Sequence, residues 1–168
     1  MRGKQFSKLF MASVITLFSN VSLALDPYFV TVEELDFKTM LPIVGSCEMD
    51  DTTAVVSDLP GSKICSENKV GTRGHFRIFS DPFTEFYVRV FQKNPEGGDG
   101  LTFVPEGTIS SPTQTISFSA NTTYLISSGN TGIINIIFGG QLYLSNEYPA
   151  GMTHSVEVTS GIEWYLKP

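Results

Sequence analysis

The sequence has few of the residues on which enzymes and metal sites most often depend. It holds two histidines and two cysteines among 168 residues. No Gly-x-Ser-x-Gly elbow, His-Glu-x-x-His pair or phosphate-binding glycine loop is present. His75 and His154 each fall in an expected strand beside turn residues, which is typical of a histidine on a strand face rather than of a catalytic base. We therefore expect a protein that is not an enzyme and that uses no cofactor.

Long hydrophobic runs are also missing, apart from one near the N-terminus. A basic start precedes the apolar stretch 9–18. Spanning a bilayer takes roughly 20 apolar residues, so a membrane anchor is the less favoured interpretation. The segment is typical of a secretory signal peptide, and its small residues predict cleavage between Ala24 and Leu25. We expect residues 25–168 to be exported as a single domain without a stable membrane anchor.

Positive charge is scarce in the chain that remains after cleavage. The first 24 residues contain three Lys or Arg and no acidic residue, which leaves 8 Lys and Arg against 17 Asp and Glu, a net charge of −9. An acidic domain of this kind repels phosphate backbones. We therefore expect no nucleic-acid partner, and no polybasic face that would bind a membrane surface.

The two cysteines, Cys47 and Cys65, both lie in the exported part. Two cysteines in an exported chain, with no odd thiol left over, most simply form one disulfide. Closing the loop between them should stabilise the fold by about 3 kcal/mol on the chain-entropy view. A metal site is the alternative, and the absence of nearby histidines disfavours it.

Amphipathic helices of convincing length are absent, and short β-favouring runs alternate with Gly, Pro, Asn and Asp. Gly139 and Gly140 interrupt a long apolar run and predict a bend within one strand rather than a turn. Seven to ten short strands with turn signals between them predict an all-β sandwich. The expected strands are 28–37, 42–47, 54–56, 74–79, 85–91, 101–104, 115–119, 133–144 and 153–164.

Two loops, 48–51 and 94–99, are rich in Asp, Asn and Glu. Oxygen-rich loops can hold Ca²⁺, but neither has the spacing of a calcium-binding loop. Solvated turns commonly have this composition. Solvated turns are therefore the favoured interpretation, and bound calcium stays open.

Three segments, taken together, resemble a known family. Segment 34–42, Glu-Leu-Asp-Phe-Lys-Thr-Met-Leu-Pro, is similar to the Leu-x-Phe-Gly-Thr opening of bacterial pilin-like secreted domains. Segment 139–144, Gly-Gly-Gln-Leu-Tyr-Leu, is similar to their Gly-Gly-x-Leu-x-Val strand, and 149–159 is similar to their closing strand. The chain departs from the pattern at Lys38, where the family usually has Gly, and at Met152, which stands near an expected Tyr.

The resemblance implies an immunoglobulin-like β-sandwich, related in look to chaperone–usher fimbrial subunits and spore-coat-U-type pilins. It implies a structural or adhesive subunit of a bacterial surface filament, in the periplasm in transit and then at the cell surface. The implied partners are copies of the chain or sister subunits, a periplasmic chaperone and an outer-membrane usher.

Assembly of such subunits works by strand complementation: a sandwich that lacks one strand takes an extended segment from its neighbour. The candidate donor is 25–32, in which Tyr28, Val30 and Val32 share one parity; the alternative is that this segment is the first strand of its own domain. The alternative function is a monomeric secreted carbohydrate- or matrix-binding module. Trp164 and the Tyr-rich strands could then form a stacking platform, although core packing explains them better.

Overall fold

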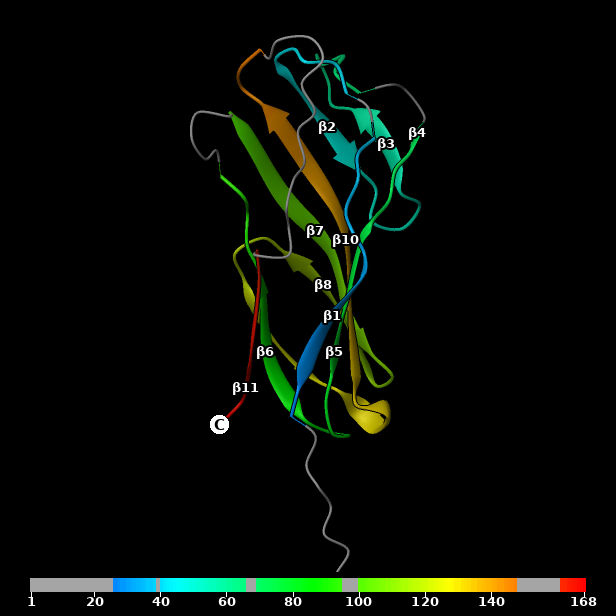
Figure 1. The fold of residues 1–168 in the computed structure, drawn as a ribbon, viewed down its shortest axis with the longest axis vertical. Helices are drawn as coiled ribbons and strands as arrows, with labels where there is room; N and C mark the ends of the chain where they lie inside the picture. The colour runs from blue at the N-terminus through cyan, green and yellow to red at the C-terminus, as the bar shows by residue number, and fades with distance from the viewer. Residues whose placement is uncertain (1–25, 39, 66–68, 95–99, 148–160) are drawn as a thin grey trace, which may run out of the picture.

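The structure is a computed structural model that describes residues 26–38, 40–65, 69–94, 100–147 and 161–168. The described residues confirm the predicted all-β sandwich (Figure 1). None of their helices is long and apolar enough to cross a membrane. The predicted cleavage site at Ala24 and Leu25 lies outside them. The elements are β1 Tyr28–Glu33, β2 Gly45–Met49, β3 Val55–Asp58, β4 Lys69–Val70, β5 Gly74–Phe79, β6 Glu85–Val90, β7 Leu101–Ser111, β8 Gln114–Ser119, β9 Thr123–Ser127, the 3-10 helix Gly129–Thr131, β10 Ile133–Leu144 and β11 Ile162–Leu166.

The long strand β10 is the centre of the larger sheet. One of its edges pairs with β7 from Asn135 to Leu144 without a register shift. The other edge pairs with β5 as far as Phe138 and with β2 from Gly140 onward. The two glycines thus mark a change of partner inside one strand, which confirms that they do not form a turn. β1 extends the sheet beyond β5, β3 and β4 extend it beyond β2, and β8 extends it beyond β7.

The smaller sheet has three antiparallel strands in the order β11, β6, β9. Every second residue of β6 is buried: Phe86, Val88 and Val90 face the core, while the residues between them face outward. β9 lies beside β7 and β8 of the larger sheet. The two sheets are therefore closed against each other along the side where β8 and β9 run.

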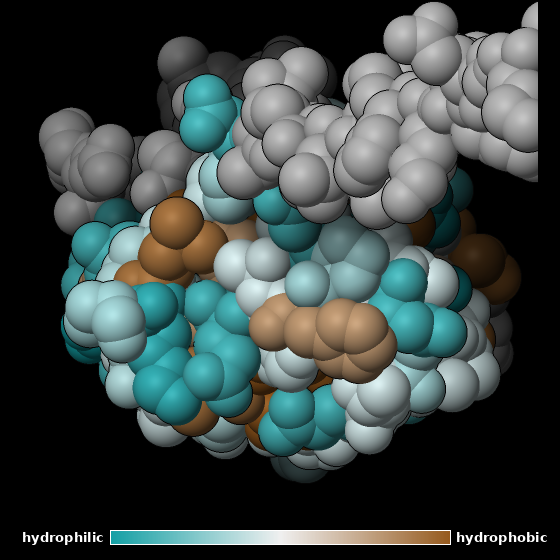
Figure 2. Space-filling model, turned by 90° about the horizontal axis from the view of Figure 1, so that it is seen from below, coloured by the Kyte–Doolittle hydropathy of each residue, from teal (hydrophilic) through white to brown (hydrophobic). Residues whose placement is uncertain are grey.

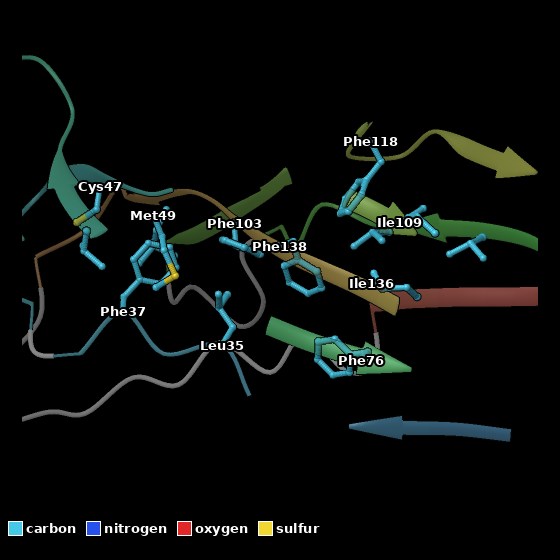
Figure 3. Close-up of a cluster of buried hydrophobic side chains, with 14 of the residues drawn as sticks. Leu35, Phe37, Cys47, Met49, Phe76, Phe103, Ile109, Phe118, Ile136 and Phe138 are labelled. Atoms are coloured by element: carbon cyan, nitrogen blue, oxygen red, sulfur yellow. The ribbon is translucent and has the colours of Figure 1, made fainter. Parts of the chain in front are cut away.

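Aromatic side chains fill the space between the sheets (Figure 3). The ring of Phe138 is fully buried, and its centroid lies 5.5 Å from that of Phe76, 6.2 Å from Phe118 and 6.4 Å from Phe103. Burying a phenylalanine side chain contributes about 1.5–3 kcal/mol. These four rings come from the larger sheet, and Phe86, Val88, Val90 and Ile126 of the smaller sheet belong to the same buried cluster.

The predicted disulfide is confirmed. Cys47 on β2 is bonded to Cys65, and their Cα atoms lie 6.0 Å apart. The carboxylate of Asp58 accepts a hydrogen bond from the Cys65 backbone N–H at 2.8 Å. Both sulfurs are used in the S–S bond, so this cluster offers a metal ion no thiolate.

Several strands differ from their predicted bounds. The described residues hold eleven strands rather than seven to ten, because β4 and β9 were not expected. The first strand ends at Glu33, not at 37, and only the end of the predicted strand 153–164 lies within the described residues. β7 runs on beyond its predicted end at 104 because it stays paired with β10, where Pro105 lies opposite Gly140, and its pairing with β8 begins only at Glu106. Proline is tolerated there, since β7 is an edge strand at that point.

Candidate functional site

On one side of the sandwich, neither sheet is extended by a further strand among the described residues. β1 ends the larger sheet and β11 ends the smaller one, on the side opposite β8 and β9. Among the described residues, β1 pairs only with β5 and β11 pairs only with β6. Each strand therefore presents one edge of backbone N–H and C=O groups that no described strand satisfies, which is the usual template for pairing with another chain.

The inner face of β11 is poorly covered. Leu166 faces the same side as the buried residue opposite it, Phe86, and Ile126 of β9 completes that cross-strand row. Ile126 and Phe86 are 1% and 0% exposed, whereas Leu166 is 48% exposed. The end of the sandwich at which β11 finishes carries hydrophobic groups among polar ones on its surface (Figure 2). The apolar layer is thus covered at β9 and uncovered at β11.

Trp164 lies on the same inward-facing side of β11 as Leu166. Its ring packs edge-to-face on Phe86, with centroids 5.9 Å apart, and the side chain is only partly buried. Core packing therefore explains the single tryptophan, and its indole does not form part of an outward-facing platform. Ile162 and Leu166 were not predicted as part of a site, and Trp164 was considered only for a stacking platform, although the alternation of the three is visible in the sequence.

β1 belongs to the sheet of its own chain in this structure. Phe29 faces inward and stacks on Phe76, with centroids 5.5 Å apart, while Tyr28 stacks on Phe79 on the outer face at 5.0 Å. The three residues proposed as donor positions are exposed: Tyr28 47%, Val30 36% and Val32 42%. The alternative that 25–32 forms an intramolecular strand thus has a place in the fold, and a donor role stays a proposal.

After β1 the chain passes through an irregular segment, and buried side chains then anchor it to the core. The register with β5 shifts between Thr31 and Glu33. Leu35 and Phe37 follow with buried side chains. Lys38 then has φ 64°, in the left-handed region that favours glycine, which is the residue usual at this position in the resembled pattern. Its ammonium and backbone N–H both donate to the carboxylate of Asp36, and these bonds lower the pKa of Asp36.

The acidic loop after Cys47 forms a tight turn around Asp50. The Asp50 carboxylate accepts bonds from the backbone N–H groups of Thr52 and Thr53, at 2.9 and 2.6 Å, and from the Thr53 hydroxyl. These bonds lower the pKa of Asp50, with the Thr53 N–H the largest cause. Arg73 donates to the carbonyls of Asp51 and Thr52. The Asp50 carboxylate is thus hydrogen-bonded to residues of its own turn, as expected for a solvated turn.

Comparisons of this chain with family models, with curated proteins and with solved structures found no match.

Proposed function

We propose that this chain is a structural or adhesive subunit of a bacterial surface filament, assembled by β-strand complementation between copies or sister subunits. The free edge of β1 in one subunit pairs with the free edge of β11 in the next. β1 keeps its place on its own β5 and acts as donor strand through its second edge. Export through the periplasm to the cell surface is part of the same proposal.

The observation that supports this proposal is a match between two uncovered apolar faces. β1 exposes Tyr28, Val30 and Val32, although Phe29 on its other face packs in the core. β11 leaves Trp164 partly buried and Leu166 48% exposed, although both face inward. An exposed edge strand with apolar side chains on both faces is a hazard in a monomer and is expected where the edge is used for pairing.

Edge-to-edge pairing would use both faces of β1. Phe29 would stay in the core of its own subunit. The exposed face of β1 would continue the inner apolar layer of the neighbour, beside Trp164 and Leu166. Backbone hydrogen bonds along the two edges would supply affinity, and the alternate side chains would supply specificity.

The same edges explain the proposed assembly partners. Until a neighbour arrives, the edges of β1 and β11 are open templates for aggregation. A periplasmic chaperone that covers them, and an outer-membrane usher that exchanges the chaperone for the next subunit, would keep assembly ordered. These two partners come from the family resemblance and are proposed on that ground.

The experiment compares two valine substitutions on edge strands. Val30→Lys places a charge on the donor face of β1, and Val70→Lys makes the same change on β4, where Val70 is 64% exposed. Sedimentation velocity of the protein comprising residues 25–168 should show concentration-dependent assembly for the wild type and for Val70→Lys. Val30→Lys should stay monomeric while melting at the wild-type temperature, because Val30 contributes little to its own core.

Two results would contradict the proposal. The first is assembly of Val30→Lys at the wild-type concentration, since the charge would then lie outside the contact. The second is a wild type that stays a stable monomer at every concentration, which would favour the secreted binding module instead.

A further inference from the structure

A band of hydrogen-bonding side chains crosses the outer face of the larger sheet. Its members come from four neighbouring strands, β5, β10, β7 and β8, and lie directly opposite one another in the register. They alternate along each strand with core residues, so they face away from the smaller sheet. The row consists of Arg77, Asn135, Ser110 and Thr115.

The cationic end of the row is held in place by Asn135. Its Oδ1 accepts a hydrogen bond from Arg77 Nε at 2.9 Å and lies 3.2 Å from His75 Nε2. Among the described residues, no acceptor bonds the two terminal nitrogens of Arg77 and no carboxylate forms an ion pair with its guanidinium. Glu33 is the acid nearest in register, and it lies opposite His75 rather than Arg77.

A second row runs beside the first and is also rich in hydroxyl groups. It begins with His75 on β5 and continues through Ile137 on β10, Thr108 on β7 and Ser117 on β8. The outer ends of both rows, Thr115 and Ser117, are exposed. Glu106 faces outward on β7 two residues from Thr108, so the negative charge of this face lies at its borders.

We propose that this band, Arg77 with Asn135, His75 and the hydroxyls of β7 and β8, binds an acidic oligosaccharide. A guanidinium with two free terminal nitrogens matches a carboxylate or sulfate group with two parallel hydrogen bonds. Neighbouring strands are about 4.8 Å apart, so four strands span roughly 14 Å. That length suits an extended oligosaccharide, whose ring hydroxyls would bond to the Ser and Thr hydroxyls.

Charge and composition favour a sugar over other anionic polymers. Residues 25–168 carry a net charge of −9, so Arg77 makes a local positive site on this face rather than part of a basic surface. Nucleic acid needs many phosphate contacts. An extended peptide binds most strongly through a free strand edge, whereas this band lies on the face of a sheet. All residues of the site come from one chain, and Arg77 lies opposite Val30 of β1 in the register, so binding is measured below the concentration at which the wild type assembles.

The test is a two-dimensional amide NMR titration of residues 25–168 with trigalacturonate, and with neutral maltotriose for comparison. Trigalacturonate should give saturable shifts confined to β5, β10, β7 and β8, and maltotriose should give none. Arg77→Gln should weaken binding roughly tenfold or more, the loss of a hydrogen bond to a charged group. Arg89→Gln is the matched control, because Arg89 faces outward on β6 and its guanidinium lies over the Phe91 ring.

A second variant keeps the test decisive if Arg77→Gln folds poorly. Asn135→Asp keeps the shape of the residue and places a carboxylate against Arg77 and His75, so the protein should fold normally and lose binding. The proposal is overturned if the wild type shows no saturable shift at roughly 10 mM trigalacturonate. It is also overturned if Asn135→Asp or a folded Arg77→Gln binds as the wild type does, or if maltotriose or a tri-aspartate peptide binds equally well.

Discussion

Gly140 lies where β10 passes close to β7 and changes its partner on the other edge. Its φ is 128°, and a Cβ atom built on it would lie 2.2 Å from the backbone carbonyl oxygen of Val104. Backbone cannot move aside as a flexible side chain can, so we expect Gly140→Ala to lower the free energy of unfolding by about 2–4 kcal/mol. Urea unfolding followed by circular dichroism measures this.

Gly61 is the matched control for that substitution. It also has a positive φ, 85°, but a Cβ on it would meet nothing within 4 Å. Gly61→Ala should therefore cost only the left-handed conformation, about 1 kcal/mol. Equal losses at the two positions would mean that the close approach of β10 to β7 is not what requires glycine at Gly140.

Asp50 makes stability depend on acid pH. Its pKa is lowered from 3.8 in the folded chain, so the stability it contributes is present above that value and is lost as pH falls through the folded pKa. Asp50→Asn keeps an oxygen that can accept the bonds from Thr52 and Thr53 but carries no charge. The variant should therefore melt below the wild type at about pH 7, and the difference between the two melting temperatures should shrink as the pH falls below 3.8.

Asp51→Asn is the control, because the Asp51 carboxylate accepts one bond, from the Thr52 hydroxyl, at 3.2 Å. A wild-type advantage over Asp50→Asn that stays constant across this pH range would show that the carboxylate charge is not responsible.

Strands with one buried face could be predicted from the sequence alone. In β6, Phe86, Val88 and Val90 alternate with polar or half-exposed residues, and the structure buries each of the three. β9 was missed because Leu125, an apolar residue that is exposed, lies between the inward-facing Tyr124 and Ile126 and hides their alternation in the sequence. β4 has two residues, too few for any pattern.

The candidate site could be predicted only in part, because an edge is a property of the whole sheet. The parity shared by Tyr28, Val30 and Val32 is visible in the sequence, but their exposure is not. β11 becomes an edge because β6 and β9 complete the rest of its sheet, and those partners are distant in the chain. The row from Arg77 to Thr115 likewise depends on the register of four strands, which local patterns do not determine.

Ile126 on β9 and Leu166 on β11 lie on either side of Phe86 in one cross-strand row. We expect their substitution to affect stability and assembly in opposite order. Ile126→Ala removes a side chain that is 1% exposed, and it should cost about 2–5 kcal/mol of stability in the monomer. Leu166→Ala removes one that is 48% exposed, and it should cost under about 1 kcal/mol. If both variants remain folded, Leu166→Ala should assemble less than Ile126→Ala at the same concentration.

Urea unfolding measures the stability of the two variants, and sedimentation velocity at matched concentrations measures their assembly. If Leu166→Ala assembled as the wild type does, β11 would not lie in the contact.

Residues 25–168 carry a net charge of −9, so copies of this part of the chain that assemble repel one another. Salt screens this repulsion, with a Debye length of about 30 Å at 0.01 M and about 8 Å at 0.15 M ionic strength. The assembled fraction should therefore rise between these two conditions, because the proposed contact is made by backbone and apolar groups. Light scattering at fixed protein concentration measures it. A fall with added salt would indicate a contact made by opposite charges, contrary to strand pairing.

Trp164 is the single tryptophan of the chain, and it lies partly buried on the strand to which the neighbour's β1 is proposed to pair. Its fluorescence therefore reports directly on that edge. As the wild type assembles with rising concentration, the emission should move to shorter wavelength, and the emission of Val30→Lys should stay unchanged. Assembly of the wild type with no change in Trp164 emission would contradict the claim that β1 of one subunit completes the sandwich of the next at β11.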